Sequence, residues 1–171
     1  RYHFLTGWFA WFGDALHLIF AMGSLFWTLG MIYAPKTFTL PVATLAAPVL
    51  GFMAFKSALG PILYRRTMQT KWIDILGASI LSVGLSHTIA RGVLAGLTHK
   101  KGTFVRTPKG WRAKGTFAFF GPIREELGML IAITASGALL VAQRGWLSLE
   151  IQLWVAILAL QTIPYLAAVL C

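Results

Sequence analysis

"LTHKKGTFVRTPKGWRAKG", residues 97–115, is a dense basic stretch with six lysines and arginines and no acidic residue. The chain around it is apolar: 57% of its 171 residues are hydrophobic and 12% are charged, whereas about 25% are charged in an ordinary soluble domain. A single soluble core of this size cannot hide so much apolar surface. The sequence therefore predicts an integral membrane protein in which this stretch is a loop in water.

The charge balance narrows the class of partner. Fifteen Lys and Arg stand against five Asp and Glu, a net charge of +10. Because the positive charges lie between apolar segments, we expect the lipid bilayer and an anionic substrate as partners, and no nucleic acid. The single cysteine, Cys171, excludes an internal disulfide and a Cys-based metal site, and the four histidines have no ligand spacing. We therefore predict no metal in this chain.

Four runs of residues have the length and apolar character of a membrane span, which needs about 20 residues. They are residues 15–34, 40–64, 126–143 and 151–170. Before the first run, residues 1–14 carry Trp8, Trp11 and Asp14, and aromatic rings beside a charge are typical of the headgroup zone. This pattern predicts a short interfacial helix that leads into the first span.

Residues 72–97 are also long enough to span, but they carry Asp74, His87 and Arg91. Short cytoplasmic loops are enriched in Lys and Arg, and both flanking stretches, 64–71 and 97–115, are basic. If residues 72–97 crossed the bilayer, the two basic stretches would lie on opposite sides. If the segment lies along the inner interface, both are cytoplasmic. The rule favours the interfacial helix, and a five-helix bundle is the alternative.

The predicted fold class is therefore all-α integral membrane, with about four transmembrane helices, two interfacial amphipathic helices and a basic cytoplasmic loop. In chain order these are an interfacial helix at 1–14, two spans in 15–64, an interfacial helix at 72–97, the loop at 98–122 and two spans in 123–171. The chain starts at Arg1 without Met and stops at Cys171 inside an apolar run. We expect it to be part of a longer protein.

This order of segments, with "TFVRTPKG" in the basic loop, resembles the C-terminal membrane region of processive family 2 glycosyltransferases, the group that includes bacterial cellulose synthase. In that family a cytoplasmic gating loop carries F-x-V-T-x-K, often followed by Gly. The matching residues are Phe104, Thr107, Lys109 and Gly110, while Arg106 stands at the family's Val position. The phrases "GWFAWFGDALHL", "LSHTIARGVLAGL" and "IREE" resemble the branch often labelled glucan synthase-like.

The resemblance implies a function. Family members use a nucleotide-diphosphate sugar and a divalent metal, expected to be Mg²⁺, in a cytoplasmic catalytic domain. They elongate a β-glycan and pass it through their own membrane helices while the gating loop folds over the nucleotide. The resemblance therefore implies that Phe104, Thr107 and Lys109 bind the nucleotide diphosphate, since Lys donates charge-assisted hydrogen bonds to phosphate. Arg106 either adds a second cation there or contacts a lipid phosphate.

The catalytic motifs of the family are absent from this chain. The family needs an Asp-x-Asp metal motif, an acidic general base and a Q-x-x-R-W acceptor motif, and none occurs here. We therefore expect no catalytic residue in these 171 residues, and a catalytic domain N-terminal to them. The family implies a multi-pass protein of the bacterial inner membrane, whose partners are the nucleotide-sugar, the growing polysaccharide, that catalytic domain and accessory subunits.

Several other residues have two readings each. Trp8, Trp11 and Trp27 are candidates for a glycan path, because sugar rings stack on aromatic faces, or they anchor and pack the helices. His87 and Arg91, one helical turn apart, form a polar seam against protein or headgroups, or face the nucleotide. The acidic pair at 125–126 opens a helix and complements its dipole, or pairs with Arg124 or the basic loop.

A second function from a different class stays open. The chain would then be a non-enzymatic membrane subunit or a small transporter whose basic loop binds anionic lipid or a partner protein. The sequence upstream of Arg1 distinguishes the two, because the synthase reading requires the catalytic motifs there.

Overall fold

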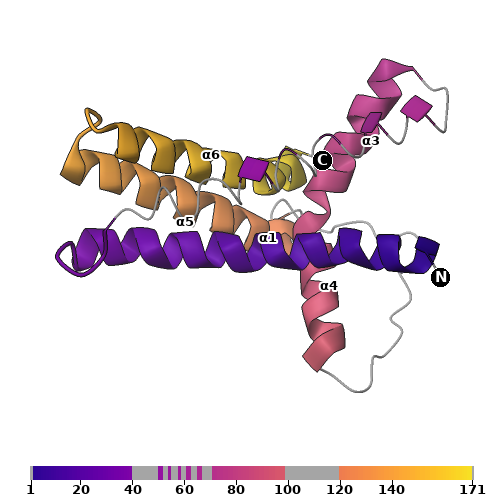
Figure 1. The fold of residues 1–171 in the computed structure, drawn as a ribbon, viewed down its shortest axis with the longest axis horizontal. Coiled ribbons are helices and arrows are strands. Elements are labelled where there is room, and N and C mark those ends of the chain that lie inside the picture. The colour runs from indigo at the N-terminus through magenta and orange to yellow at the C-terminus, as the bar shows by residue number, and fades with distance from the viewer. Residues whose placement is uncertain are drawn as a thin grey trace.

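The computed structural model describes residues 2–39, 71–98 and 120–170, together with eight helical positions between residues 50 and 66. All regular structure in these ranges is helical, which confirms the predicted all-α class (Figure 1). The named helices are α1 (Tyr2–Tyr33), α3 (Trp72–Gly84), α4 (Ser86–Thr98), α5 (Phe120–Arg144) and α6 (Leu149–Leu170).

Three helices, α1, α5 and α6, pack along one another as a bundle (Figure 1). Each contains an apolar segment of spanning length: Trp11–Tyr33, Ile123–Arg144 and Leu149–Leu170, of 23, 22 and 22 residues. At about 1.5 Å per residue each segment is roughly 33 Å long, against a hydrocarbon core of about 30 Å. The bundle therefore has the dimensions of a membrane domain.

The outer surface of the bundle is apolar. Large hydrophobic side chains stay exposed along α1, α5 and α6, among them Leu16, Ile19, Met22, Phe26, Ile131, Leu139, Ile163 and Leu166. A monomeric soluble protein rarely exposes apolar patches of this extent. Lipid is the solvent that such a surface requires, and the protein is a membrane protein.

The inward face of α1 is polar where its outer face is apolar. Asp14, His17, Ala21, Ser24 and Thr28 recur at spacings of three and four residues, and all five are buried. This spacing places them on one face of the helix. The pattern is the reverse of a soluble amphipathic helix, because the polar groups must avoid lipid and find partners inside the bundle.

Ser24 and Thr28 have partners on α6. The Trp154 indole Nε1 donates to Thr28 Oγ1 at 3.0 Å, and the Gln161 amide Nε2 donates to Ser24 Oγ at 2.8 Å. All four side chains are buried, beside an apolar core formed by α1, α5 and α6. Interhelical hydrogen bonds of this kind stabilise membrane bundles by about 0.6 kcal/mol each.

Helices α5 and α6 form a hairpin that is closed by a glycine. Gly145 follows α5 with φ of 78°, a left-handed conformation, and its N–H donates to Val141 O at 2.8 Å. This single bond is the αL form of a helix C-cap, which glycine adopts without the Cβ clash. Two helices of spanning length thus pack directly against each other within residues 123–171.

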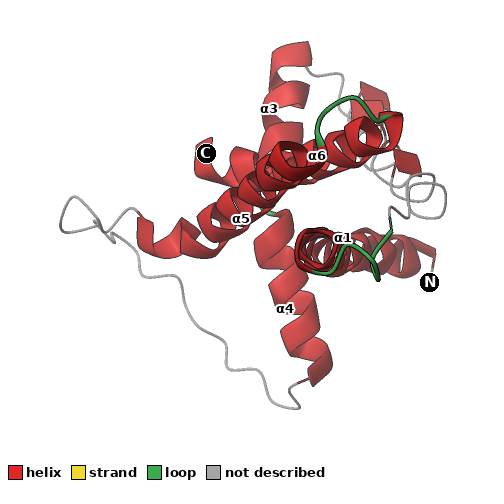
Figure 2. Ribbon diagram, turned by 90° about the vertical axis from the view of Figure 1, so that its left-hand side faces the viewer, coloured by secondary structure: helices red, strands yellow, loops and turns green. Residues whose placement is uncertain are grey.

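Helices α3 and α4 run across the bundle rather than along it (Figures 1 and 2). The sequence predicted one helix over residues 72–97, whereas the structure has two, bent by 44° at Leu85. Gly84 and Ser86 flank the bend, and Gly/Ser pairs are a usual cause of sharp kinks. The pair together is long and apolar enough to count as a fourth span.

Gly84 also fixes where the pair crosses the bundle. A Cβ built on Gly84 would lie 3.2 Å from Ala168 N and 3.3 Å from Ala167 C, both backbone atoms of α6. Ile75 and Gly84 are the buried residues of α3, and the rest of that helix is partly or fully exposed. The C-terminal end of α3 is therefore held against α6 by direct backbone contact.

The structure corrects one predicted element boundary, and another predicted element lies mostly outside the described residues. The sequence separated an interfacial helix at 1–14 from a span that starts at residue 15, but residues 2–33 are one continuous helix. Gly13 at the join is a weak helix former that costs about 1 kcal/mol relative to Ala, but no proline interrupts the helix there. The second predicted span, residues 40–64, lies mostly outside the described residues.

Candidate functional site

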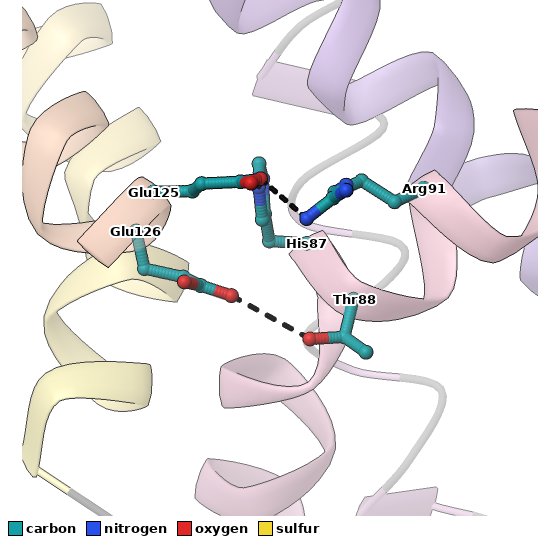
Figure 3. A network of polar contacts seen from close by, with 5 residues as sticks. All are labelled: His87, Thr88, Arg91, Glu125 and Glu126. Atoms are coloured by element: carbon teal, nitrogen blue, oxygen red, sulfur yellow. Dashed lines mark hydrogen bonds and ion pairs between the residues drawn. The ribbon is translucent and has the colours of Figure 1, made fainter. Parts of the chain in front are cut away.

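A network of polar side-chain contacts joins α4 to α5 (Figure 3). Arg91 Nη1 donates to Glu125 Oε2 at 2.5 Å, and His87 Nε2 lies 3.5 Å from the same oxygen. His87 and Arg91 are one helical turn apart on α4, so both side chains reach one carboxylate on α5. The predicted polar seam of His87 and Arg91 thus packs against the protein.

A second contact lies beside the first and is more deeply buried. Thr88 Oγ1 lies 3.5 Å from Glu126 Oε1 (Figure 3). The Glu126 residue is 6% exposed, and its other oxygen, Oε2, has no hydrogen-bond partner among the described residues. The two neighbouring carboxylates therefore differ: Glu125 is half-exposed and paired with a cation, while Glu126 is buried with the Thr88 hydroxyl as its donor.

Tyr165 of α6 connects this network to α1. Its ring centroid lies 5.7 Å from that of His87 on α4 and 6.3 Å from that of His17 on α1. Tyr165 and His87 are buried, and within the described part of the chain Tyr165 Oη and His87 Nδ1 lack hydrogen-bond partners. Side chains of four helices thus meet at one end of the bundle.

The network joins the two helices that flank the basic segment. Helix α4 ends at Thr98 and α5 begins at Phe120, so residues 99–119 connect them. The Arg91 and Glu125 side chains are 59% and 39% exposed, and an exposed ion pair contributes only about 0–1 kcal/mol to stability. The contact therefore adds a polar connection between α4 and α5 but little folding energy, and α4 packs mainly against α1.

The predicted nucleotide-binding residues, Phe104, Arg106, Thr107 and Lys109, all lie outside the described residues. Trp8 lies within α1, but its side chain is likewise outside the described set.

The other two tryptophans named as glycan-path candidates lie far apart on α1. Trp11 is 52% exposed. Trp27 packs edge-on against Phe38, with ring centroids 5.1 Å apart, and its Nε1 donates to Thr39 O. The 16 residues between them correspond to about 24 Å along a helix. They thus lie toward opposite ends of the span, and the structure does not bring them together.

The glutamates differ from the prediction in position and partner. They were expected to open a helix, but α5 starts at Phe120, so Glu125 and Glu126 lie in its second turn, beyond the strongest effect of the helix dipole. The expected partners were Arg124 or the basic loop, whereas Glu125 pairs with Arg91 and His87 of α4.

No role was predicted from the sequence for Tyr165, for Gln161 or for the polar face of α1. The signal for that face was present, because Asp14, His17, Ser24 and Thr28 show helical spacing in the sequence.

No protein-family model, curated protein or solved structure matches the chain. Among residues 2–39, 71–98 and 120–170, no group of three or more His, Cys, Asp or Glu side chains is placed to hold a metal ion.

Proposed function

We propose that this chain is the membrane-channel and gating portion of a glycosyltransferase. The whole protein would polymerise a β-glycan from a nucleotide-diphosphate sugar and translocate it across the bacterial inner membrane. The observation that carries the proposal is the place of "TFVRTPKG", residues 103–110, between two helices that are joined by the Arg91–Glu125 contact. The resemblance of that motif and of its flanking segments to processive family 2 enzymes supplies the chemistry.

The arrangement of the helices supports the proposed topology. Helices α3 and α4 cross the bundle at the end of the α5–α6 hairpin opposite its connecting turn, and the N-terminal part of α1 continues beyond the crossing (Figure 1). If the bundle axis is the membrane normal, the pair lies near the membrane surface, and the basic stretches before α3 and after α4 share one side. The positive-inside rule then makes that side cytoplasmic, where nucleotide-sugars would be used.

The roles of the residues follow from their chemistry. Lys109 would donate charge-assisted hydrogen bonds to the diphosphate, Arg106 would add a second cation, and the Thr107 hydroxyl would add a donor. Phe104 would hold the segment by apolar contact. The α4–α5 contacts would keep both ends of the segment at a constant separation, so that the segment closes on the nucleotide from a fixed base.

The test uses inverted membrane vesicles that contain the full-length protein. Labelled nucleoside-diphosphate hexoses and Mg²⁺ are added, and incorporation of label into polymer is measured. We expect one hexose to be incorporated, and Lys109→Ala to lower the rate much more than Lys114→Ala. If no hexose is incorporated and the protein instead binds vesicles of anionic lipid through residues 97–115, the chain is the non-enzymatic membrane subunit or transporter of the alternative reading.

A further inference from the structure

The N-terminal half of α3 extends away from the bundle (Figures 1 and 2). Its large apolar side chains are exposed there: Trp72 by 55%, Ile73 by 75% and Leu76 by 55%. Because α3 runs across the bundle axis, this end points sideways, into the space that lipid occupies around a membrane domain. An exposed apolar helix in that position is typical of interfacial anchoring.

Cations gather at the same end. Arg65, Arg66 and Lys71 are all exposed, and the Arg65 guanidinium lies over the Trp72 ring at 4.9 Å from its centroid. Asp74 is the acidic residue in the first turn of α3. Three cations stand against one carboxylate, so this end of the helix carries a local excess of two positive charges.

We propose that Arg65, Arg66, Lys71 and Trp72 form a binding site for the phosphate of an anionic phospholipid headgroup. A guanidinium matches the oxygens of a phosphate with two parallel hydrogen bonds. Tryptophan prefers the headgroup level, where its ring meets the acyl chains and its N–H meets water. The stacking of Arg65 on Trp72 holds the cation and the ring at one depth, which fixes the guanidinium where a headgroup phosphate lies.

Charge complementarity decides in favour of lipid over a second protein. Juxtamembrane clusters of Lys and Arg are attracted to anionic leaflets, with an effect of about fivefold in affinity for each cation near the surface. The apolar face of α3 continues directly from the cluster, so one ligand with an anionic head and an apolar tail satisfies both. The site is independent of the proposed glycan synthesis, because it uses no residue of 97–115.

The test counts lipids bound to the purified full-length protein by native mass spectrometry. Phosphatidylglycerol and phosphatidylcholine with identical acyl chains are the probes, offered in equal amounts. We expect the protein to retain phosphatidylglycerol in preference, and the double variant Arg65→Ala/Arg66→Ala to lose about 25-fold in that preference. Lys36→Ala, which removes an exposed cation from the turn after α1, is the matched control and should leave the preference unchanged.

A second measurement does not depend on the double variant folding. Brominated phosphatidylglycerol should quench the tryptophan fluorescence of the protein more than brominated phosphatidylcholine does, and Trp72→Phe should remove most of that difference. The proposal would be overturned if the protein retained the two lipids equally, or if the double variant kept its preference for phosphatidylglycerol. It would also be overturned if Trp72→Phe left the difference in quenching between the two brominated lipids unchanged.

Discussion

Arg91 and Glu125, separated by 34 residues, meet at 2.5 Å and join the helix before the basic segment to the helix after it. Both side chains are partly exposed, so the contact contributes little to folding. We expect its consequence to be geometric, because it connects α4 and α5, the helices at the two ends of residues 99–119. The predictions below separate that positional role from a role in stability.

Breaking this contact should change nucleotide binding and hardly change stability. We expect Arg91→Ala and Glu125→Ala each to lower the unfolding free energy by less than about 1 kcal/mol, and to weaken nucleoside-diphosphate binding severalfold in the full-length protein. The charge swap Arg91→Glu/Glu125→Arg should restore most of the affinity, because it restores the attraction. If the swap binds no better than the single variants, the contact does not position the segment.

The crossing of α3 and α6 should disfavour a bulky side chain at Gly84. Gly84→Val should destabilise the protein by about 1–3 kcal/mol, because the added side chain meets the backbone of Ala167 and Ala168, which must shift to make room. Gly77→Val in the same helix is the control, since nothing lies within 4 Å of a Cβ there. Thermal unfolding in detergent should separate the two variants by several degrees, and equal midpoints would contradict the packing.

The hydrogen bond from Trp154 to Thr28 should show as a coupling energy. We expect a double-mutant cycle of Trp154→Phe and Thr28→Val to give about 0.6 kcal/mol, and no more than about 1.7 kcal/mol, as is usual between membrane helices. Trp146→Phe, in the exposed turn between α5 and α6, should show no coupling with Thr28→Val. These free energies are measured by unfolding in mixed micelles with increasing denaturing detergent. A coupling energy of zero between Trp154 and Thr28 would show that the hydrogen bond does not form.

Both basic stretches should lie on the cytoplasmic side. In a Cys171→Ser background, single cysteines at Thr70 and Thr103 should stay unlabelled when intact cells meet an impermeant thiol reagent, and should be labelled once the membrane is opened. A cysteine at Lys36, in the turn after α1, is the control that should be labelled from outside. Labelling of only one of the two basic stretches in intact cells would show that residues 72–97 cross the membrane.

Three of the four predicted spans coincide with helices of spanning length, because a helix in lipid must be apolar over about 20 residues, a property of a continuous run. It does not predict which helices touch. The Arg91–Glu125 contact depends on how two helices fold back on each other, and each charge also had a nearby alternative, such as Arg124 for Glu125. The approach of Gly84 to the backbone of α6 is likewise a tertiary contact.

The polar face of α1 was present in the sequence and was missed for a different reason. Asp14, His17, Ser24 and Thr28 are interrupted by large apolar residues, so the run is apolar on average. The average hydropathy of the run predicts a span, but it does not predict which side of the helix the polar groups face. In lipid they must face inward, and the structure places them there, with Thr28 and Ser24 bonded to α6.

The most direct test of the proposed function is the affinity of the full-length protein for a nucleoside diphosphate with Mg²⁺, compared between Lys109→Ala and Lys114→Ala. The two lysines lie five residues apart in the same basic stretch, and only Lys109 lies in the motif. Removing one charge-assisted bond to phosphate costs about 1.5–3 kcal/mol, so Lys109→Ala should weaken binding by about one to two decades and Lys114→Ala by much less. Equal losses in the two variants, or no binding by the unaltered protein, would contradict a nucleotide-gating segment.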